Sequence, residues 1–336
     1  MASLHIPAGY VQKMTIRETE KAIKFIKDTF EVELAAALNL ERVSAPLFVC
    51  PETGLNDDLN GVERAVSFDI PSAKKEIVQI VHSLAKWKRQ ALHEYGFEVG
   101  EGLYTDMNAI RRDEELDNIH SVYVDQWDWE KVLSAEQRTE AYLKDTVAKI
   151  YAVMVGIQRA VCSRYSVLQP VLPDEIFFIT TQELLEKYPT YTPKERENAI
   201  TREKGAVFLM QIGDVLSDGK THDGRAPDYD DWALNGDILL WSPILESAFE
   251  VSSMGIRVDA TALKEQLQKA GCEDRMNRPF HKMLCEGKLP LSIGGGIGQS
   301  RICMFFLQCA HIGQVQASLW PDDMIAQCKE NGITLL

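Results

Sequence analysis

Alternating side chains between residues 120 and 130 predict a strand whose two faces differ in chemistry. Valine, tyrosine and tryptophan dominate this stretch, and these residue types favour strands. Strand side chains alternate faces, so one largely aromatic face carries Ser121, Tyr123, Asp125, Trp127 and Trp129. The opposite face begins apolar and ends in one amide and two carboxylates, and it carries Val122, Val124, Gln126, Asp128 and Glu130.

The residues before this strand predict its partner. Residues 103–111 have the pattern of a strand that ends at Arg111 and Arg112, and residues 112–119 are polar and acidic. The two strands are expected to pair as a long antiparallel hairpin, which brings Arg111 near the carboxylates. The alternative is an edge strand whose polar end lies in water. Because polar groups on a covered strand need partners, the hairpin favours a functional site.

The first helix is predicted by its cap and by its apolar spacing. Thr15 and Glu18 form the pattern of a capping box, and apolar residues then recur at helical spacing as far as residue 38. Residues 40–49 follow as a predicted strand that carries Pro46. We therefore expect a long helix that leads directly into a strand.

A second helix is predicted after the strands expected at residues 63–70 and 77–82. It begins within residues 82–90, with Ser83 as its cap and with Lys86 and Arg89 on a solvated face. The helix start, with Ser83 and the nearby Lys88, is alternatively an anion-binding site, because helix N-termini attract negative charge.

Composition bounds the class of protein. A chain of 336 residues that is 45% hydrophobic predicts a globular protein of one large or two small domains. It has no run of 18 apolar residues, no signal-peptide pattern, and seven scattered cysteines without a Cys-x-x-Cys pair. We expect a cytoplasmic protein with no membrane span and no zinc site. The net charge of −14 argues against a large nucleic-acid footprint.

Two acidic residues in the block from 217 to 259 are candidate metal ligands. Asp237 precedes one predicted strand and Glu250 lies on the next, so their carboxylates can converge. Mg²⁺ near phosphates prefers a few carboxylates together with phosphate oxygens and water. On spacing alone, two exposed acids on a hairpin are an equally good interpretation.

The glycine-rich stretch 292–301 precedes an apolar helix. Glycine allows a close approach between backbone and ligand. Gln299 stands where a dinucleotide-binding fingerprint has its third glycine, so that fingerprint does not apply.

Three of these segments resemble the motifs of class II aminoacyl-tRNA synthetases, in the same order. Motif 1 matches residues 15–49, motif 2 matches 103–130, and motif 3 matches 292–308. The resemblance implies that Arg111 holds the ATP α-phosphate and that Arg301 packs on adenine. Val124 stands where the synthetases usually have a phenylalanine stacked on adenine.

Longer stretches resemble one family within this class, the ammonia-dependent asparagine synthetases. The stretches are 82–90, 120–130, 225–232, 235–241, 249–258 and 294–301. The chain has no residues left for an anticodon-binding domain, so a single catalytic domain is expected over 1–336. The glutamine-using family needs an N-terminal cysteine nucleophile, and Cys50 is the first cysteine here.

The resemblance implies an α+β fold in a homodimer, with an eight-stranded, mainly antiparallel sheet flanked by helices. It implies that L-aspartate, ATP and ammonia give L-asparagine, AMP and pyrophosphate through a β-aspartyl-adenylate, with Mg²⁺. The implied catalytic residues are Arg111, Asp128 and Arg301. The implied ATP contacts are Arg111, His120, Val122, Val124, Ser252, Gly296, Gly298 and Arg301. Mg²⁺ is assigned to Asp237 and Glu250.

The implied aspartate contacts are Asp57, Ser83, Lys88, Gln126, Asp128, Asp230, Ser253 and Arg257. Asp57, Asp128 and Asp230 are alternatives for the substrate α-ammonium group. Asp128 is also a candidate to bind ammonium and to take a proton from the attacking nitrogen.

Two other functions stay open on the sequence. One is an anticodon-less synthetase paralogue that adenylates an amino acid for another acceptor. The other is a non-catalytic nucleotide or amino-acid sensor, which should have lost Arg111, Asp237, Glu250 or Arg301; all four are present.

Overall fold

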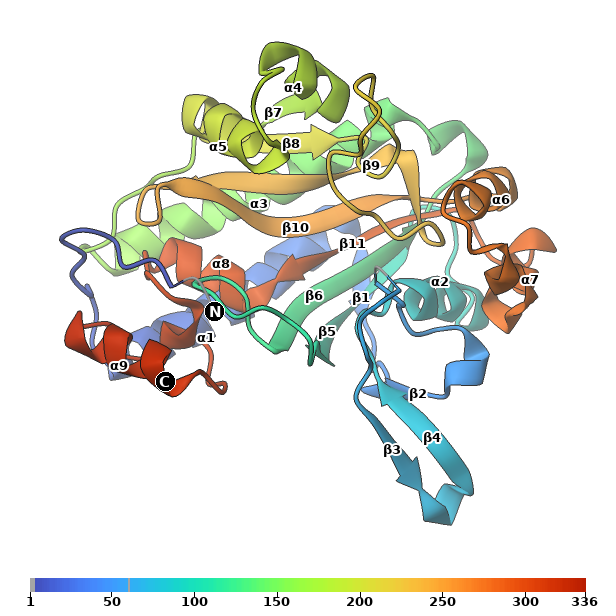
Figure 1. Cartoon of the computed structure of the whole chain (residues 1–336), viewed down its shortest axis with the longest axis horizontal. Coiled ribbons are helices and arrows are strands. Elements are labelled where there is room, and N and C mark those ends of the chain that lie inside the picture. Colours follow the sequence, from blue (N-terminus) through green and yellow to red (C-terminus); the bar gives the residue numbers. More distant parts are fainter. Residues whose placement is uncertain (1–3, 60) are drawn as a thin grey trace.

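The structure is a computed structural model of the chain, and it describes residues 4–59 and 61–336. Within them, eight strands form one sheet (Figure 1), in the order β1 (Leu40–Arg42), β5 (Gly102–Ile110), β6 (Tyr123–Val132), β11 (Ser292–Gly298), β10 (Ser247–Arg257), β9 (Asp230–Ser242), β8 (Ala206–Met210) and β7 (Phe177–Thr180). Neighbours are antiparallel except for the parallel pairs β1–β5 and β7–β8 at the edges. The predicted α+β fold is confirmed, with a mixed rather than purely antiparallel sheet.

Helices flank this sheet, and a small second sheet projects from it. The helices are α1 (Ile16–Leu38), α2 (Ala85–Glu94), α3 (Glu140–Arg164), α4 (Thr181–Lys187), α5 (Pro193–Lys204), α6 (Ala260–Lys269), α7 (Pro279–Cys285), α8 (Gln299–Phe306) and α9 (Asp322–Glu330). The second sheet consists of β2 (Phe48–Val49), β4 (Lys75–Ile80) and β3 (Ser67–Ile70), in that order. Figure 1 shows β3 and β4 extending away from the main body.

The predicted hairpin is the centre of the large sheet. β5 and β6 pair antiparallel from Gly102–Lys131 to Ile110–Tyr123. The aromatic face of β6 packs into the main core, where Trp127 stacks on Phe30 of α1 at 4.3 Å between ring centroids. Because side chains alternate, the amide and carboxylates of β6 point to the other side of the sheet, where α2 packs.

The predicted capping box of α1 is confirmed, since the Thr15 side chain accepts from the backbone N–H of Glu18 and the Glu18 carboxylate accepts in return. The single strand predicted at 40–49 is wrong. It divides into β1 and β2, which belong to different sheets. Pro46 lies in the interruption, and proline has no N–H to donate to a strand partner.

Two predictions about α2 are also wrong. The N-cap residue of α2 is Leu84 rather than Ser83, and no side chain caps the helix. The Ser83 hydroxyl donates to Asp57. Lys86 and Arg89 do not form a solvated face, since they are 1% and 2% exposed.

No helix among residues 4–59 and 61–336 combines the length and apolar character needed to cross a membrane.

Candidate active site

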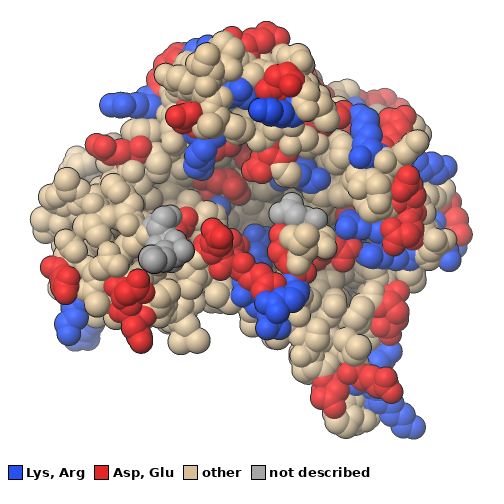
Figure 2. All heavy atoms as spheres, viewed as in Figure 1, with Lys and Arg blue, Asp and Glu red and all other residues tan. Residues whose placement is uncertain are grey.

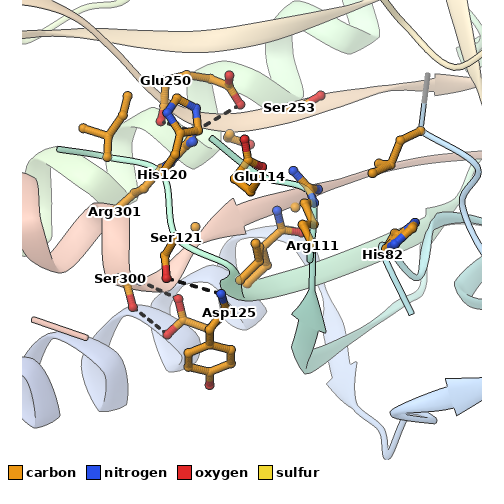
Figure 3. Close-up of a pocket in the computed structure, with 18 of the residues that line it drawn as sticks. His82, Arg111, Glu114, His120, Ser121, Asp125, Glu250, Ser253, Ser300 and Arg301 are labelled. Atoms are coloured by element: carbon orange, nitrogen blue, oxygen red, sulfur yellow. Dashed lines mark hydrogen bonds and ion pairs between the residues drawn. The ribbon is translucent and has the colours of Figure 1, made fainter. Parts of the chain in front are cut away.

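A cavity of about 550 Å³ opens on the side of the sheet that carries the β6 amide and carboxylates. Figure 2 shows it as a hollow on this face with charged side chains around it. Its wall contains eleven of the residues predicted from the sequence, which are Arg111, His120, Val124, Gln126, Asp237, Glu250, Ser252, Ser253, Gly296, Gly298 and Arg301. These residues come from four separate segments of the chain, so folding brings together what the motifs predicted (Figure 3).

The other predicted residues lie around this cavity without lining it. Asp57 lines a second, smaller cavity, and its carboxylate accepts from the Ser83 hydroxyl at 2.9 Å. Val122 directly precedes β6, and its carbonyl accepts from the N–H of Arg111 at 2.9 Å. A buried charged cluster behind the wall comprises Lys88, Asp128, Asp230 and Arg257.

Glycines of β11 allow the Gln126 amide to lie across the strand. A Cβ atom on Gly296 would come within 2.1 Å of the Gln126 side-chain oxygen. The stem of Arg301 lies near Gly298 at a longer distance, since a Cβ there would be 3.2 Å from Arg301 Cβ. The glycines of this strand therefore make room for polar side chains rather than for a turn.

Arg301 and Glu250 are in contact at one end of the cavity. Arg301 is the third residue of α8, and its Nη1 donates to the backbone carbonyl of Glu250 at 3.0 Å. The same nitrogen lies 3.5 Å from the Glu250 carboxylate, whose side chain is 42% exposed. Burial alone would raise the pKa of Glu250, but the charges of Arg301 and Arg225 more than offset this effect, so its pKa is lowered.

Asp237 lies beside Glu250, on β9, and is held by an arginine that sequence reasoning missed. Arg225 Nη2 donates to Asp237 Oδ1 at 2.6 Å, and Arg225 also donates to the hydroxyl of Ser253. Burial and the charge of Glu250 raise the pKa of Asp237 to about 7, against the lowering effect of Arg225. In the sequence, Arg225 was marked only as the first residue of the stretch 225–232, directly after an Asp-Gly pair.

The two carboxylates fit Mg²⁺ rather than a metal with an all-protein cage. The described residues contain no group of three or more His, Cys, Asp or Glu placed to hold a metal. Asp237 is 15% exposed and Glu250 is 42% exposed, both in the cavity wall. Mg²⁺ commonly binds one or two carboxylates and completes its shell with phosphate oxygens and water.

The buried cluster behind the wall is an ion network on the α2 side of β6. Arg257 donates to both oxygens of Glu130, at 2.9 and 2.7 Å, and also to Asp230. Lys88 donates to Asp128 and, at 2.7 Å, to the carbonyl of Trp129. Burial raises the pKa of Asp128 even with Lys88 beside it. Burial would also raise the pKa of Glu130, but the charges of Arg257 and Lys88 outweigh it and the net shift is downward.

Lys86 and Arg89, expected in solvent, also have internal partners. Lys86 lies 3.2 Å from Asp228. Arg89 donates to the carbonyls of Pro290 and Val258, at 2.9 and 2.7 Å. Burial lowers the pKa of Arg89 to about 10. Through these contacts the two cations join α2 to the segments just before β9, just after β10 and just before β11. They therefore support the wall of the cavity from behind.

Comparison with known proteins decides the family. From residue 17 to residue 332, the sequence matches the protein family described as aspartate–ammonia ligase. The chain belongs to the aspartate–ammonia ligase family. It is 62% identical to the aspartate–ammonia ligase of Ruminiclostridium cellulolyticum and 60% identical to that of Clostridium perfringens, each over 336 residues and the full length of both chains.

Solved structures place this aspartate–ammonia ligase family member in the class II synthetase fold. Asparaginyl-tRNA synthetase of Pyrococcus horikoshii, complexed with asparaginyl-adenylate, superimposes with a TM-score of 0.63 at 14% identity, over 91% of this chain and 71% of that one. The Entamoeba histolytica enzyme, also with asparaginyl-adenylate, gives 0.62 at 12% identity, and this chain spans 66% of its length. The predicted class II core is therefore confirmed.

Proposed function

We propose that this chain makes L-asparagine from L-aspartate, ATP and ammonia, and releases AMP and pyrophosphate. The observation that carries this proposal is one cavity in which Arg111, Arg301, Asp237 and Glu250 meet, in a member of the aspartate–ammonia ligase family. Arg111 can bind a phosphate and Arg301 can pack on adenine there, while the carboxylates hold a metal. This arrangement supports adenylation of a carboxylate.

The chemical problem is that a carboxylate resists attack by an amine, because its oxygen is a poor leaving group. Transfer of AMP to the β-carboxylate makes the leaving group a phosphate, so one difficult step becomes two easier ones. The residues of the cavity then act by positioning the reactants and by stabilising charge. The intermediate in this proposal is a β-aspartyl-adenylate.

Nucleotide binding is assigned to the end of the cavity near β11 and α8. Arg111 contacts the α-phosphate, where a planar guanidinium matches phosphate oxygens, and Arg301 packs on adenine. The remaining nucleotide contacts are assigned to His120, Val122, Val124, Ser252, Gly296 and Gly298. Mg²⁺ bound by Asp237 and Glu250 would neutralise phosphate charge. Arg225, which holds Asp237 in this structure, would then turn to the phosphates.

Aspartate binding is assigned to the end near Gln126 and Ser253, with Asp57 and Ser83 beside it. Lys88, Asp128, Asp230 and Arg257 stay candidates for this subsite. Their charges are largely satisfied by one another and by Glu130, which supports an indirect role in shaping the subsite. An anticodon-less paralogue and a sensor are not favoured, because relatives that match the full chain are aspartate–ammonia ligases.

The test is product analysis by mass spectrometry after incubation with aspartate, ATP, Mg²⁺ and ammonium. The proposal expects asparagine together with AMP. Aspartate-dependent pyrophosphate exchange without asparagine would instead support the paralogue, and no reaction at all would support the sensor.

We also propose that the protein is a cytoplasmic homodimer. Its support is the resemblance of α1 and the following strands to motif 1, which builds the dimer interface in class II synthetases. Light scattering at micromolar concentration is expected to give twice the mass of the chain. A monomer mass would contradict this part of the proposal and leave the chemistry untouched.

A further inference from the structure

A second cavity of about 310 Å³ lies beside the first, and His82 belongs to the wall of both. His82 lies three residues before the start of α2, and it is 2% exposed. Figure 3 places its ring on the same side of the large cavity as Arg111. A buried histidine thus stands between the nucleotide cavity and the smaller cavity that Asp57 lines.

Hydrogen bonds fix the position of this ring and the tautomer of its neutral form. The backbone N–H of His82 donates to Asn56 at 2.9 Å, and the ring Nδ1 lies 3.0 Å from the backbone carbonyl of Asp57. A carbonyl oxygen can only accept, so Nδ1 carries a hydrogen, and the neutral tautomer with that hydrogen has its lone pair on Nε2. Nε2 has no hydrogen-bond partner among the described residues, although it is buried. Buried polar atoms are normally paired, so this atom calls for a ligand that donates an N–H or O–H.

The second cavity carries an excess of negative charge that suits a small cation. Its wall contains four carboxylates, at Asp57, Asp58, Glu63 and Asp274, and two guanidinium groups, at Arg275 and Arg278. Both arginines contact the same acid, Asp58, at 3.4 and 2.5 Å. Formal charge on this wall is therefore negative by two, which attracts an ammonium ion and repels ATP.

We propose that His82 Nε2 receives ammonium from the second cavity, takes one of its protons, and releases ammonia next to the adenylate. This inference rests on the proposed function, because it requires an activated β-carboxylate in the first cavity. It assigns the proton acceptor to His82, which belongs to the wall of both cavities, rather than to Asp128, which lines neither of them. His82 is then a catalytic residue of the second half-reaction only.

The step balances in atoms and charge. One proton moves from ammonium to Nε2, which leaves neutral ammonia and an imidazolium ion. The nitrogen lone pair forms the C–N bond to the carbonyl carbon of the activated β-carboxylate, and the bond from that carbon to the phosphate oxygen breaks, so its electron pair leaves with AMP. The new amide nitrogen sheds one further proton to solvent, and the imidazolium later returns its own proton to solvent.

The test separates the two half-reactions in a His82→Asn variant. The asparagine amide can still donate to the Asp57 carbonyl in place of Nδ1, but it offers no basic nitrogen. Aspartate-dependent pyrophosphate exchange is expected to stay at the wild-type rate. Asparagine formation from ammonium at neutral pH is expected to fall by about 10²-fold or more, the usual contribution of a positioned general base.

Hydroxylamine provides the decisive comparison, because at neutral pH it is mostly unprotonated and needs no proton removed before it attacks. Formation of aspartyl hydroxamate by His82→Asn is expected to stay close to the wild-type rate. His93→Asn is the matched control, since His93 is exposed in the last turn of α2 and lies outside both cavities. It is expected to leave all three rates unchanged.

Two results would overturn the inference. One is asparagine formation from ammonium by His82→Asn at the wild-type rate. The other is an equal loss with ammonium and with hydroxylamine, which would mean that His82 does not act on the proton of ammonium. If exchange is also lost, His82→Gln is tested in the same way, and loss of exchange in both variants assigns His82 to adenylation or folding and rejects the proposal. Absence of exchange in the wild-type protein would instead reject the proposed function.

Discussion

Lys88 and Asp128 form an ion pair behind the wall of the nucleotide cavity, and both side chains are almost fully shielded from solvent, at 0% and 4% exposure. Lys88 also lies 3.6 Å from Glu130, which Arg257 holds from the other side. Asp128 therefore connects α2 to the network that supports β6 and β11. Its Oδ2 atom is buried and has no hydrogen-bond partner among the described residues.

We expect Asp128→Asn to weaken both half-reactions together. The substitution removes the charge that balances Lys88, and breaking a buried ion pair from one side typically costs about 3–5 kcal/mol. Pyrophosphate exchange and asparagine formation should fall in parallel, with a raised KM for aspartate. Retained exchange with lost asparagine formation would instead give Asp128 the proton-acceptor role.

Arg111→Ala and Arg301→Ala are each expected to reduce pyrophosphate exchange by about 10²- to 10³-fold, because each removes a charge-assisted contact made to the phosphates or the base. The fold should survive, which circular dichroism checks. Arg159→Ala is the matched control, since Arg159 is 67% exposed and pairs with Asp174 on the surface. Exchange near the wild-type rate in either cavity variant would reject the assignment of the ATP site.

Two glycine substitutions should have opposite effects on stability. A Cβ on Gly294 would lie 1.9 Å from the Glu130 carboxylate and 2.6 Å from Arg257 Nη2, so Gly294→Ala is expected to lower the free energy of unfolding by about 3 kcal/mol or more. Gly156, inside α3, has no atom within 4 Å of such a Cβ, and Gly156→Ala should raise stability by about 0.5–1 kcal/mol. Urea unfolding measures both, and equal stability of Gly294→Ala and wild type would contradict the packing described for β11.

Acid should destabilise the protein partly through His311. This ring is fully buried, and its Nδ1 accepts from the backbone N–H of Gly313 at 3.0 Å. Burial lowers the pKa of His311 to about 4, against a small opposing effect of Asp117. The unfolded chain, with a pKa of about 6.5, therefore binds one more proton between these values.

Stability is accordingly expected to fall as pH drops from about 6.5 towards 4, by at most about 3 kcal/mol from this residue. Thermal unfolding across this range should show a weaker pH dependence for His311→Asn than for the wild type. His93→Asn should keep the full dependence. Identical slopes for wild type and His311→Asn would contradict the buried neutral form.

The sequence predicted most of the fold because its signals were local. The cap at Thr15, the helical spacing after it and the alternation along β6 each determine one element without reference to the rest of the chain. The strand at 40–49 failed because its length was read from propensity alone. The pairing of β1 with β5 and of β2 with β4 depends on residues far away in the chain.

The site was only partly predictable because burial of charge is a property of the assembled fold. Lys86 and Arg89 are spaced like a solvated helical face, yet partners from distant segments bury them. Arg225 gave no signal of its own, because its role comes from Asp237 on a neighbouring strand. Strand β11 was not predicted, because residues 292–298 are rich in glycine and glycine is depleted in strands. Glycine is needed here because Gln126, Glu130 and Met254 of the neighbouring strands lie too close for a Cβ atom.

Adenylation of the aspartate β-carboxylate is the central step of the proposed reaction, and one isotope measurement tests this step directly. Aspartate labelled with ¹⁸O in the β-carboxylate is incubated with ATP, Mg²⁺ and ammonium, and the products are weighed by mass spectrometry. The account predicts asparagine and AMP, with one ¹⁸O from aspartate in the phosphate of AMP. ADP with labelled inorganic phosphate, or AMP without the label, would contradict it.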